Sequence, residues 1–279
     1  MNIFDNLPVL LFAAAWVLIL ILWLGFKIPP RLRIPELGTS NPPPKTMPIP
    51  PDLPAPVANY INQIHGQDPG AARSVVVYGQ GQFRVRRLPL IGYLWAPLAW
   101  TLHILPGEAF VWQARIYWWR NLIVDGGEEY REGQGRFSMG KKTIEGETMN
   151  RSEQVVMWLY TLLYAPVAVL EFPGLLWTTE GEHSASLKIP AGEQFLSFRL
   201  DFDAHSGRLA QIETQRPASR SGEFFPYQVK IGAYRSVGNN LTLPTRFSVA
   251  WEKDEYARYE VAGVSMNAPV DEVIAAGLG

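Results

Sequence analysis

Residues 150–173 read NRSEQVVMWLYTLLYAPVAVLEFP, and the rest of the chain is best interpreted around this apolar stretch. From Val155 to Leu170 only Thr161 and Pro166 interrupt the apolar residues. Such a run is too hydrophobic for a helix on a protein surface, and it is too short and too broken by proline for a membrane span. The stretch therefore predicts a helix that is covered by the rest of the protein.

The residues around this stretch predict where the helix begins and ends. Asn150 is a typical N-cap, and Glu153 lies three residues further on, as in a capping box. Pro166 lacks the N–H group that would continue the helix. We expect a helix from about Ser152 to Tyr164, followed by a kink. Three roles remain open: a helix that fills a curved sheet, a lid over a ligand, or a second segment that dips into a membrane.

The composition narrows the class of protein. The 279 residues allow one large or two modest domains, and an apolar content of 47% is ample for a core. The net charge of -1 gives no general attraction to nucleic acid, so we expect no nucleic-acid partner. The sequence contains no cysteine, which excludes disulfides, thiolate metal sites and cysteine nucleophiles.

The first part of the chain predicts a membrane anchor. Asn6 to Phe26 contains no charged residue and is long enough to cross ~30 Å of hydrocarbon. A cleaved signal peptide would need a basic segment before the apolar run and a small-residue cleavage site after it, and both are missing. We therefore predict a single transmembrane helix within residues 1–27, with the lipid bilayer as its partner.

A proline-rich segment follows the predicted anchor. Residues 28–56 contain eleven prolines, which favour an extended chain and predict a linker over residues 28–52. Lys27, Arg31 and Arg33 follow the apolar run, so the positive-inside rule predicts a cytoplasmic position for the remaining chain.

Residues 53–266 are predicted to form a mainly antiparallel β domain. A short helix comes first, over Pro56 to His65, because its apolar residues recur with helical spacing: Val57, Tyr60, Ile61 and Ile64. The period then changes to two, which is typical of strands with one buried face. The alternating segments contain Phe83 and Val85, Phe110 to Trp118, Leu196 to Phe202, Tyr227 to Ala233, Phe247 to Trp251, and Tyr259 to Val261. Residues 267–279 are predicted to form a C-terminal tail.

Two segments of this domain are harder to interpret. Residues 203–208 and 237–240 carry turn residues typical of hairpins. Leu88 to Leu105 is apolar but interrupted by prolines, and we expect a strand followed by a loop against a membrane or cavity. The charged stretch from Asp125 to Arg136 is interpreted as a solvated hairpin, although its paired carboxylates would suit acid–base chemistry if one were buried.

No residues form a recognisable catalytic or metal site. The four histidines are scattered, and no pair has the spacing of a zinc motif. We therefore assign no catalytic residue and no metal ligand, and we expect no cofactor.

The order of several motifs resembles an uncharacterised bacterial family of domains of unknown function. The motifs are LPAPVANY (53–60), PGEAFVWQARI (106–116), EEYREGQGRF (128–137), the apolar helix, YQVKIGAYR (227–235), LPTRFSVAW (243–251) and YARYEV (256–261). That family is similar in architecture to lipoprotein-localisation-factor (LolA-like) carriers. The resemblance implies an antiparallel sheet that curls into an incomplete barrel, with a helix across its concave face. It also favours the exported side of the membrane, in conflict with the charge rule.

These observations favour a binding protein. An apolar ligand such as a lipid, an isoprenoid or an acyl chain would lie in the concave sheet, against aromatic walls. The predicted ligand-binding residues are Trp112, Trp158, Leu162, Phe198 and Trp251. A structural or accessory membrane protein with a filled core is the main alternative, and a membrane-associated enzyme is a third possibility.

Overall fold

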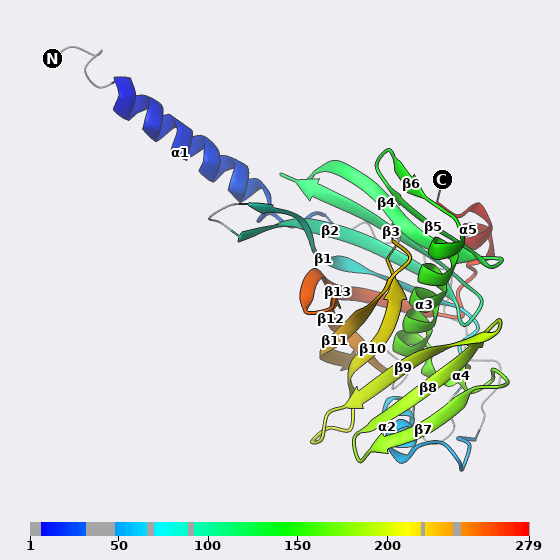
Figure 1. Ribbon diagram of the computed structural model, residues 1–279. Helices are drawn as coiled ribbons and strands as arrows, with labels where there is room; N and C mark the ends of the chain where they lie inside the picture. The colour runs from blue at the N-terminus through cyan, green and yellow to red at the C-terminus, as the bar shows by residue number, and fades with distance from the viewer. Residues whose placement is uncertain are drawn as a thin grey trace.

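A computed structural model describes residues 7–31, 48–65, 70–88, 92–218, 221–236 and 241–278. These residues form one antiparallel sheet of 13 strands together with a few helices (Figure 1). The helices are α1 (Leu7–Gly25), α2 (Ala55–His65), α3 (Glu147–Tyr164), α4 (Pro166–Val169) and α5 (Asp271–Ala276). The strands are β1 (Val75–Leu88), β2 (Gly92–Leu105), β3 (Ala109–Trp118), β4 (Asn121–Arg131), β5 (Gln134–Met139), β6 (Lys142–Ile144), β7 (Leu176–Gly181), β8 (Ser184–Ala191), β9 (Gln194–Phe202), β10 (Leu209–Pro217), β11 (Phe224–Ser236), β12 (Thr242–Trp251) and β13 (Asp254–Met266).

The sheet is open, and its two edge strands, β6 and β7, are consecutive strands of the chain. The strand order is β6-β5-β4-β3-β2-β1-β13-β12-β11-β10-β9-β8-β7, so that β1 pairs with β13 in the middle. Between the edge strands β6 and β7 the chain forms α3 and α4. Because α3 contacts β4 and β5 as well as β10 and β12, it lies across the inner face of both halves of the sheet (Figure 1).

The main core lies between the inner face of the sheet and the helices α2 and α3. The apolar stripe predicted for residues 56–65 is buried there, with Val57, Tyr60, Ile61 and Ile64 all at most 3% exposed. A smaller cluster on the opposite face holds α5 against β1 and β3 through Val76, Val111, Val270 and Ile274. The residues predicted as a tail thus contain a helix that packs on the outer face.

The central helix is confirmed, but its predicted N-terminal capping box is wrong. Helix α3 begins one turn earlier, at Glu147, and its N-cap is Gly146, which has a positive φ of 111°. The Asn150 side chain instead accepts a hydrogen bond from the backbone N–H of Gly135 (2.8 Å), and Glu153 is buried in an ion pair described below. Both side chains therefore bind the helix to the sheet and do not cap it. Capping rules consider only the spacing of residues in the sequence, so they miss such tertiary contacts.

The predicted C-terminal end of the helix is confirmed. Helix α3 stops at Tyr164, and Pro166 starts the short helix α4 at its first position, where its missing N–H costs no hydrogen bond.

The ambiguous stretch from Leu88 to Leu105 contains a long central strand, β2, in place of the expected strand and loop. Pro97 is tolerated there because pairing of β2 with β3 begins only at Leu98, opposite Ile116. At Pro97 the strand pairs with β1 alone, opposite Gln82. A missing N–H at this point costs no hydrogen bond to β3.

Helix α1 occupies almost the whole apolar segment predicted to be an anchor, and it projects from the body (Figure 1). Its large apolar side chains from Val9 to Leu24 are exposed. Among the residues that the structure describes, no helix is both long enough and apolar enough to span a membrane. Most of the predicted linker (32–47) and the predicted turn at 237–240 lie outside the described residues, and the domain limits stay predictions.

Candidate functional site: a cavity under the central helix

A cavity of about 290 Å³ lies between α3 and the inner face of the sheet. One wall is a helical stripe of α3, formed by Ser152, Val156, Leu159, Tyr160 and Leu163. The other walls come from strands of both halves of the sheet. Their aromatic residues are Phe83, Trp112, Phe137, Tyr227, Phe247, Trp251, Tyr256 and Tyr259. The cavity therefore has mainly apolar, aromatic walls.

The aromatic wall is held by ring contacts and one hydroxyl pair. Phe247 stacks on Tyr259 with ring centroids 4.7 Å apart, and Tyr227 meets Trp251 edge to face at 5.0 Å. The Tyr227 and Tyr256 hydroxyl oxygens lie 2.8 Å apart and share a hydrogen bond. Burial raises the pKa of Tyr227 to about 12, so this phenol is neutral at physiological pH.

A buried arginine on β10 forms the polar part of the cavity wall. Arg216 is 3% exposed, and its Nε donates a hydrogen bond to Ser152 Oγ (2.8 Å). Its Nη2 donates to Glu153 Oε1 (2.8 Å) and lies 3.7 Å from Glu128 Oε1. The guanidinium also lies over the Tyr227 ring, 4.9 Å from its centroid. One arginine thus connects α3, β4 and β10 at the edge of an apolar cavity.

The charges of this cluster do not balance with both carboxylates ionised, because one guanidinium faces two carboxyl groups. Burial raises the pKa of Glu153 well above the ordinary carboxyl value, and the neighbouring Glu128 raises it further, against the opposing effect of Arg216. Glu153 Oε2 is buried and has no hydrogen-bond partner among the described residues. We therefore regard Glu153 as the carboxyl group that takes up a proton.

A second cluster of charges lies on the outer face of the same strand. Side chains alternate along β4, so Glu128 faces the cavity while Glu129 faces outward. Glu129 is 3% exposed and lies between Arg131 (3.7 Å) and Arg136 (3.9 Å). Its Oε2 accepts a hydrogen bond from the backbone N–H of Leu278 (2.5 Å). The interpretation of this stretch as a solvated hairpin is therefore wrong for both glutamates.

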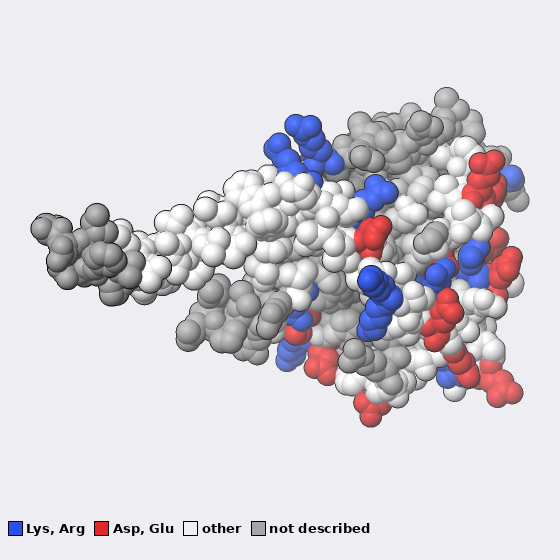
Figure 2. Space-filling model, turned by 90° about the horizontal axis from the view of Figure 1, so that it is seen from above, with Lys and Arg blue, Asp and Glu red and all other residues white. Residues whose placement is uncertain are grey.

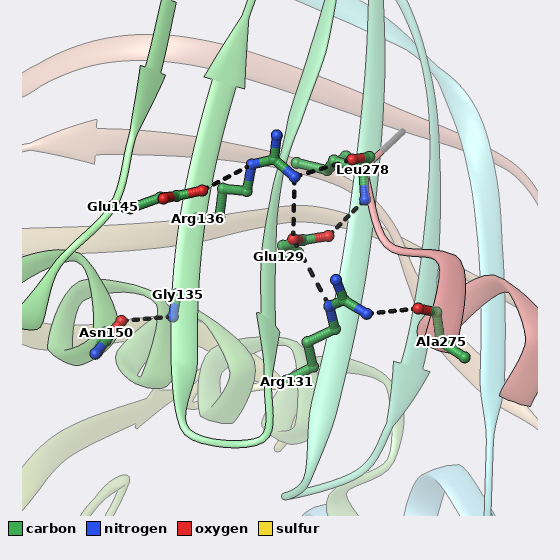
Figure 3. A network of polar contacts seen from close by, with 8 residues as sticks. All are labelled: Glu129, Arg131, Gly135, Arg136, Glu145, Asn150, Ala275 and Leu278. Carbon is green, nitrogen blue, oxygen red and sulfur yellow. Dashed lines mark hydrogen bonds and ion pairs between the residues drawn. The ribbon is translucent and has the colours of Figure 1, made fainter.

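The outer cluster fastens the C-terminal segment to the sheet, as Figure 3 shows. Arg131 donates a hydrogen bond to the carbonyl of Ala275 (2.5 Å), and Arg136 donates to that of Leu278 (3.1 Å). Arg136 also pairs with Glu145 (3.2 Å). Arginines that bind carbonyl groups at the end of a helix are a common form of C-terminal capping. This cluster therefore holds the C-terminal segment against the outer face of the sheet.

The five predicted ligand-binding residues do not all meet at one place. Trp112 and Trp251 line the cavity. Trp158 lines a separate hollow of about 620 Å³, and its ring meets Phe172 edge to face at 5.0 Å. Leu162 and Phe198 are buried in the main core without lining the cavity. The structure thus brings together two of the five around the cavity.

Sequence reasoning missed the polar part of the cavity. On β10, Arg216 follows the buried residues Ile212 and Thr214 at every second position, and alternate residues of a strand face the same side. This alternation in the sequence could have predicted that Arg216 points inward. Glu153 precedes the cavity residues Val156 and Tyr160 by three and seven positions, which places it on the same side of α3. Among the described residues, no group of three or more His, Asp or Glu side chains is arranged to hold a metal ion.

The chain belongs to the family of unknown function DUF6544, which matches residues 45–260. This match confirms the family resemblance inferred from the order of the motifs. Among solved structures, the chain is similar to a crystal structure described as a "putative outer membrane lipoprotein-sorting protein domain" from Vibrio parahaemolyticus. The sequence identity is 8%, the TM-score is 0.42, and the match covers 72% of this chain and 88% of that chain. No curated protein matches the sequence.

Proposed function

We propose that this protein is a membrane-attached module that binds a small hydrophobic ligand in the cavity between α3 and the sheet. The observation that carries the proposal is the unfilled space of about 290 Å³ inside an aromatic wall. The cavity is partly open to solvent, so an apolar ligand that enters it would displace water from the aromatic wall. Aromatic and aliphatic walls offer water few hydrogen bonds, so an apolar ligand is the better occupant.

The volume limits the size of the ligand. An engineered cavity of about 150 Å³ holds one benzene molecule, and the cavity under α3 has roughly twice that volume. It therefore suits one or two rings, or the end of an acyl or isoprenoid chain, and is too small for a complete two-chain lipid.

The polar wall adds a preference for a ligand with an oxygen atom at one end. Arg216 lines the cavity, and its Nε and Nη2 groups are bonded to Ser152 and Glu153. A carbonyl or hydroxyl oxygen of the ligand would accept a hydrogen bond from its guanidinium. A neutral group suits the site better than a second anion, because two carboxyl groups already face the arginine.

The proposed attachment to a membrane rests on α1. Its exposed apolar side chains need an apolar partner, and a lipid bilayer is the partner that a continuous uncharged stretch such as Leu7–Gly25 fits best. Lys27, Arg31 and Arg33 favour the cytoplasmic side for the folded domain. Protease added to spheroplasts tests the side, since cleavage of residues 32–47 from outside would place the domain on the exported side.

Native mass spectrometry of the full-length protein, extracted from cells in lipid nanodiscs, tests ligand binding. We expect a co-purifying small apolar molecule. The variant Val249→Phe, which adds volume at the cavity wall, should lower its occupancy, whereas Val273→Phe on α5 should leave it unchanged. If no molecule accompanies the parent protein, and if Val249→Phe is destabilised as expected for a core that is already filled, the ligand-binding proposal fails. A structural membrane module would then be the better account.

A further inference from the structure

The hairpin between β3 and β4 exposes an unusual group of apolar side chains. Trp119, Leu122 and Ile123 are 38%, 50% and 47% exposed. Among the described residues outside α1, eight large apolar side chains are at least 38% exposed. Three of the eight lie between residues 119 and 123. Isolated exposed apolar residues are ordinary, but a cluster at the tip of one hairpin marks an interaction surface.

The turn of this hairpin has a conformation that its residues do not favour. Trp118 pairs with Asn121, so Trp119 and Arg120 form a two-residue turn, with φ values of 49° and 64°. Such turns usually contain Asn-Gly, because L side chains, and bulky ones above all, rarely adopt positive φ. Strained backbone of this kind is typically kept where it has a function. Here it holds a tryptophan at the tip of the β3–β4 hairpin.

The hairpin tip is joined directly to the end of α1. The Trp118 indole N–H donates a hydrogen bond to the carbonyl of Leu22 (3.0 Å), and the backbone N–H of Trp119 donates to that of Gly25 (3.0 Å). A side chain at Gly25 would collide with both tryptophans, because an added Cβ would lie 2.1 Å from the Trp118 ring and 2.4 Å from the Trp119 ring. The close contact between helix and hairpin therefore requires glycine.

The charged residues in the two chain segments that meet at this junction are basic. No acidic residue occurs in residues 7–31 or 116–124, whereas Lys27 and Arg120 are exposed beside the apolar side chains. Figure 2 shows the projecting helix without charged side chains and with Lys and Arg side chains near its base. Tryptophan together with basic residues is the composition that favours the boundary between water and anionic lipid head groups.

We infer that the β3–β4 hairpin tip inserts into the same bilayer surface as α1 and forms a second membrane contact. This inference rests on the proposed membrane attachment through α1. Because the tip is bonded to the last turn of that helix, it lies at the level where the helix leaves the bilayer. Two contacts fix the orientation of the sheet relative to the membrane, which a single helix would leave free.

The absence of cysteine from the chain allows a direct test with single labels. Leu18→Cys, Ile123→Cys and Gln134→Cys are each made in the full-length protein and labelled with an environment-sensitive fluorophore. Each is then reconstituted into vesicles of phosphatidylcholine and phosphatidylglycerol. Gln134 is the matched control, because it lies at the opposite end of β4 from Ile123, across the β4–β5 turn. All three side chains are exposed, so the labels do not disturb the core.

We expect the labels at Leu18 and Ile123 to be quenched by nitroxide-bearing lipids and the label at Gln134 to be unaffected. Quenching at Leu18 alone would overturn the inference and leave the attachment through α1 intact. Quenching at neither position would overturn both proposals. Equal quenching at Ile123 and Gln134 would also overturn the inference, because it would indicate adsorption of the whole domain instead of insertion of the tip.

Discussion

The two faces of β4 carry two charged clusters with different compositions. On the inner face one arginine, Arg216, holds two carboxyl groups beside an apolar cavity. On the outer face two arginines hold one carboxylate, Glu129, and also bind backbone carbonyls of the C-terminal segment. In the outer cluster both oxygens of the buried carboxylate have partners, whereas in the inner cluster Glu153 Oε2 has none among the described residues.

The hydrogen-bond partners of the buried carboxyl groups distinguish the two clusters. A cluster that only holds two elements together has all its oxygens bonded within the protein, whereas a cluster that binds a ligand keeps an oxygen or nitrogen for it. Buried polar groups are almost always hydrogen-bonded, so a buried oxygen without a partner in the protein calls for an explanation. The outer cluster is complete without any further molecule. In the inner cluster a protonated Glu153 has the neighbouring Glu128 as an acceptor, and the cluster borders the cavity, where a ligand can reach it.

The largest expected effect is the loss of the inner arginine. Arg216→Met should reduce the free energy of unfolding by about 3 kcal/mol, the lower end of the range for breaking a buried ion pair, because Glu153 is already protonated and Glu128 alone loses a charged partner. Urea denaturation measures the loss. Arg199→Met on the neighbouring strand is the control, since its ion pairs are exposed and should be worth less than about 1 kcal/mol. Equal losses in the two variants would contradict a buried inner cluster.

An intermediate effect is expected on the outer face. Glu129→Ala removes the acceptor of the Leu278 N–H and the partner of two arginines, which should cost about 1 to 3 kcal/mol. Hydrogen exchange of residues 271–278 should become faster, because α5 loses its fastening to the sheet. Glu182→Ala on an exposed turn should change neither quantity. Unchanged exchange in α5 would show that the apolar cluster alone holds the helix.

The smallest effect is expected for Glu153→Gln, which imitates the neutral carboxyl group. If Glu153 is protonated in the folded protein, this change should alter the free energy of unfolding at neutral pH by less than about 1 kcal/mol. An ionised Glu153 would instead give a loss of about 3 to 5 kcal/mol, as for a broken buried pair. Urea denaturation of both proteins decides between the two states.

The raised pKa of Glu153 also predicts how the free energy of unfolding of the parent, relative to Glu153→Gln, changes with pH. The pKa of Glu153 is raised in the folded state above the ordinary value of 4.5, so the folded protein binds the proton more tightly than the unfolded chain. Its stabilising contribution is therefore complete below pH 4.5 and is lost as the pH rises through the folded-state pKa. The stability of the parent relative to Glu153→Gln should fall over that range. A difference that rises with pH would contradict the assignment.

The sequence predicted the elements that depend on local patterns. The period-two segments are strands, the stripe from Val57 to Ile64 is a buried helix face, and α3 ends before Pro166. These features depend on near neighbours in the chain. A strand was expected within Leu88–Leu105, but its full length was not, because the proline in β2 is tolerated only through the absence of β3 pairing at Pro97. That pairing is a property of the sheet, and the residues of β2 alone do not show it.

The charged interior was harder to predict, for a related reason. Glu128 and Glu153 are typical surface or capping residues in isolation, and they lie inside because Arg216, from a distant part of the chain, meets them. Glu129 is covered by the C-terminal segment and accepts a hydrogen bond from its Leu278 N–H. Arg216 lies 63 residues from Glu153 in the sequence. Trp112 and Trp251 were found because aromatic residues at inward positions of strands line a concave sheet regardless of their partners.

The pairing of the first strand with the last determines when the two halves of the sheet can join during synthesis. Val75 on β1 lies opposite Met266 on β13, so the two halves of the sheet join only after nearly the whole chain has left the ribosome. Until then β1 has one unpaired edge, and the nascent chain is exposed to aberrant strand pairing. Trp112 comes from the first half and Tyr227 and Trp251 from the second. A product truncated before β13 lacks Tyr256 and Tyr259 and the strand that joins the two halves of the sheet, so its cavity wall is incomplete.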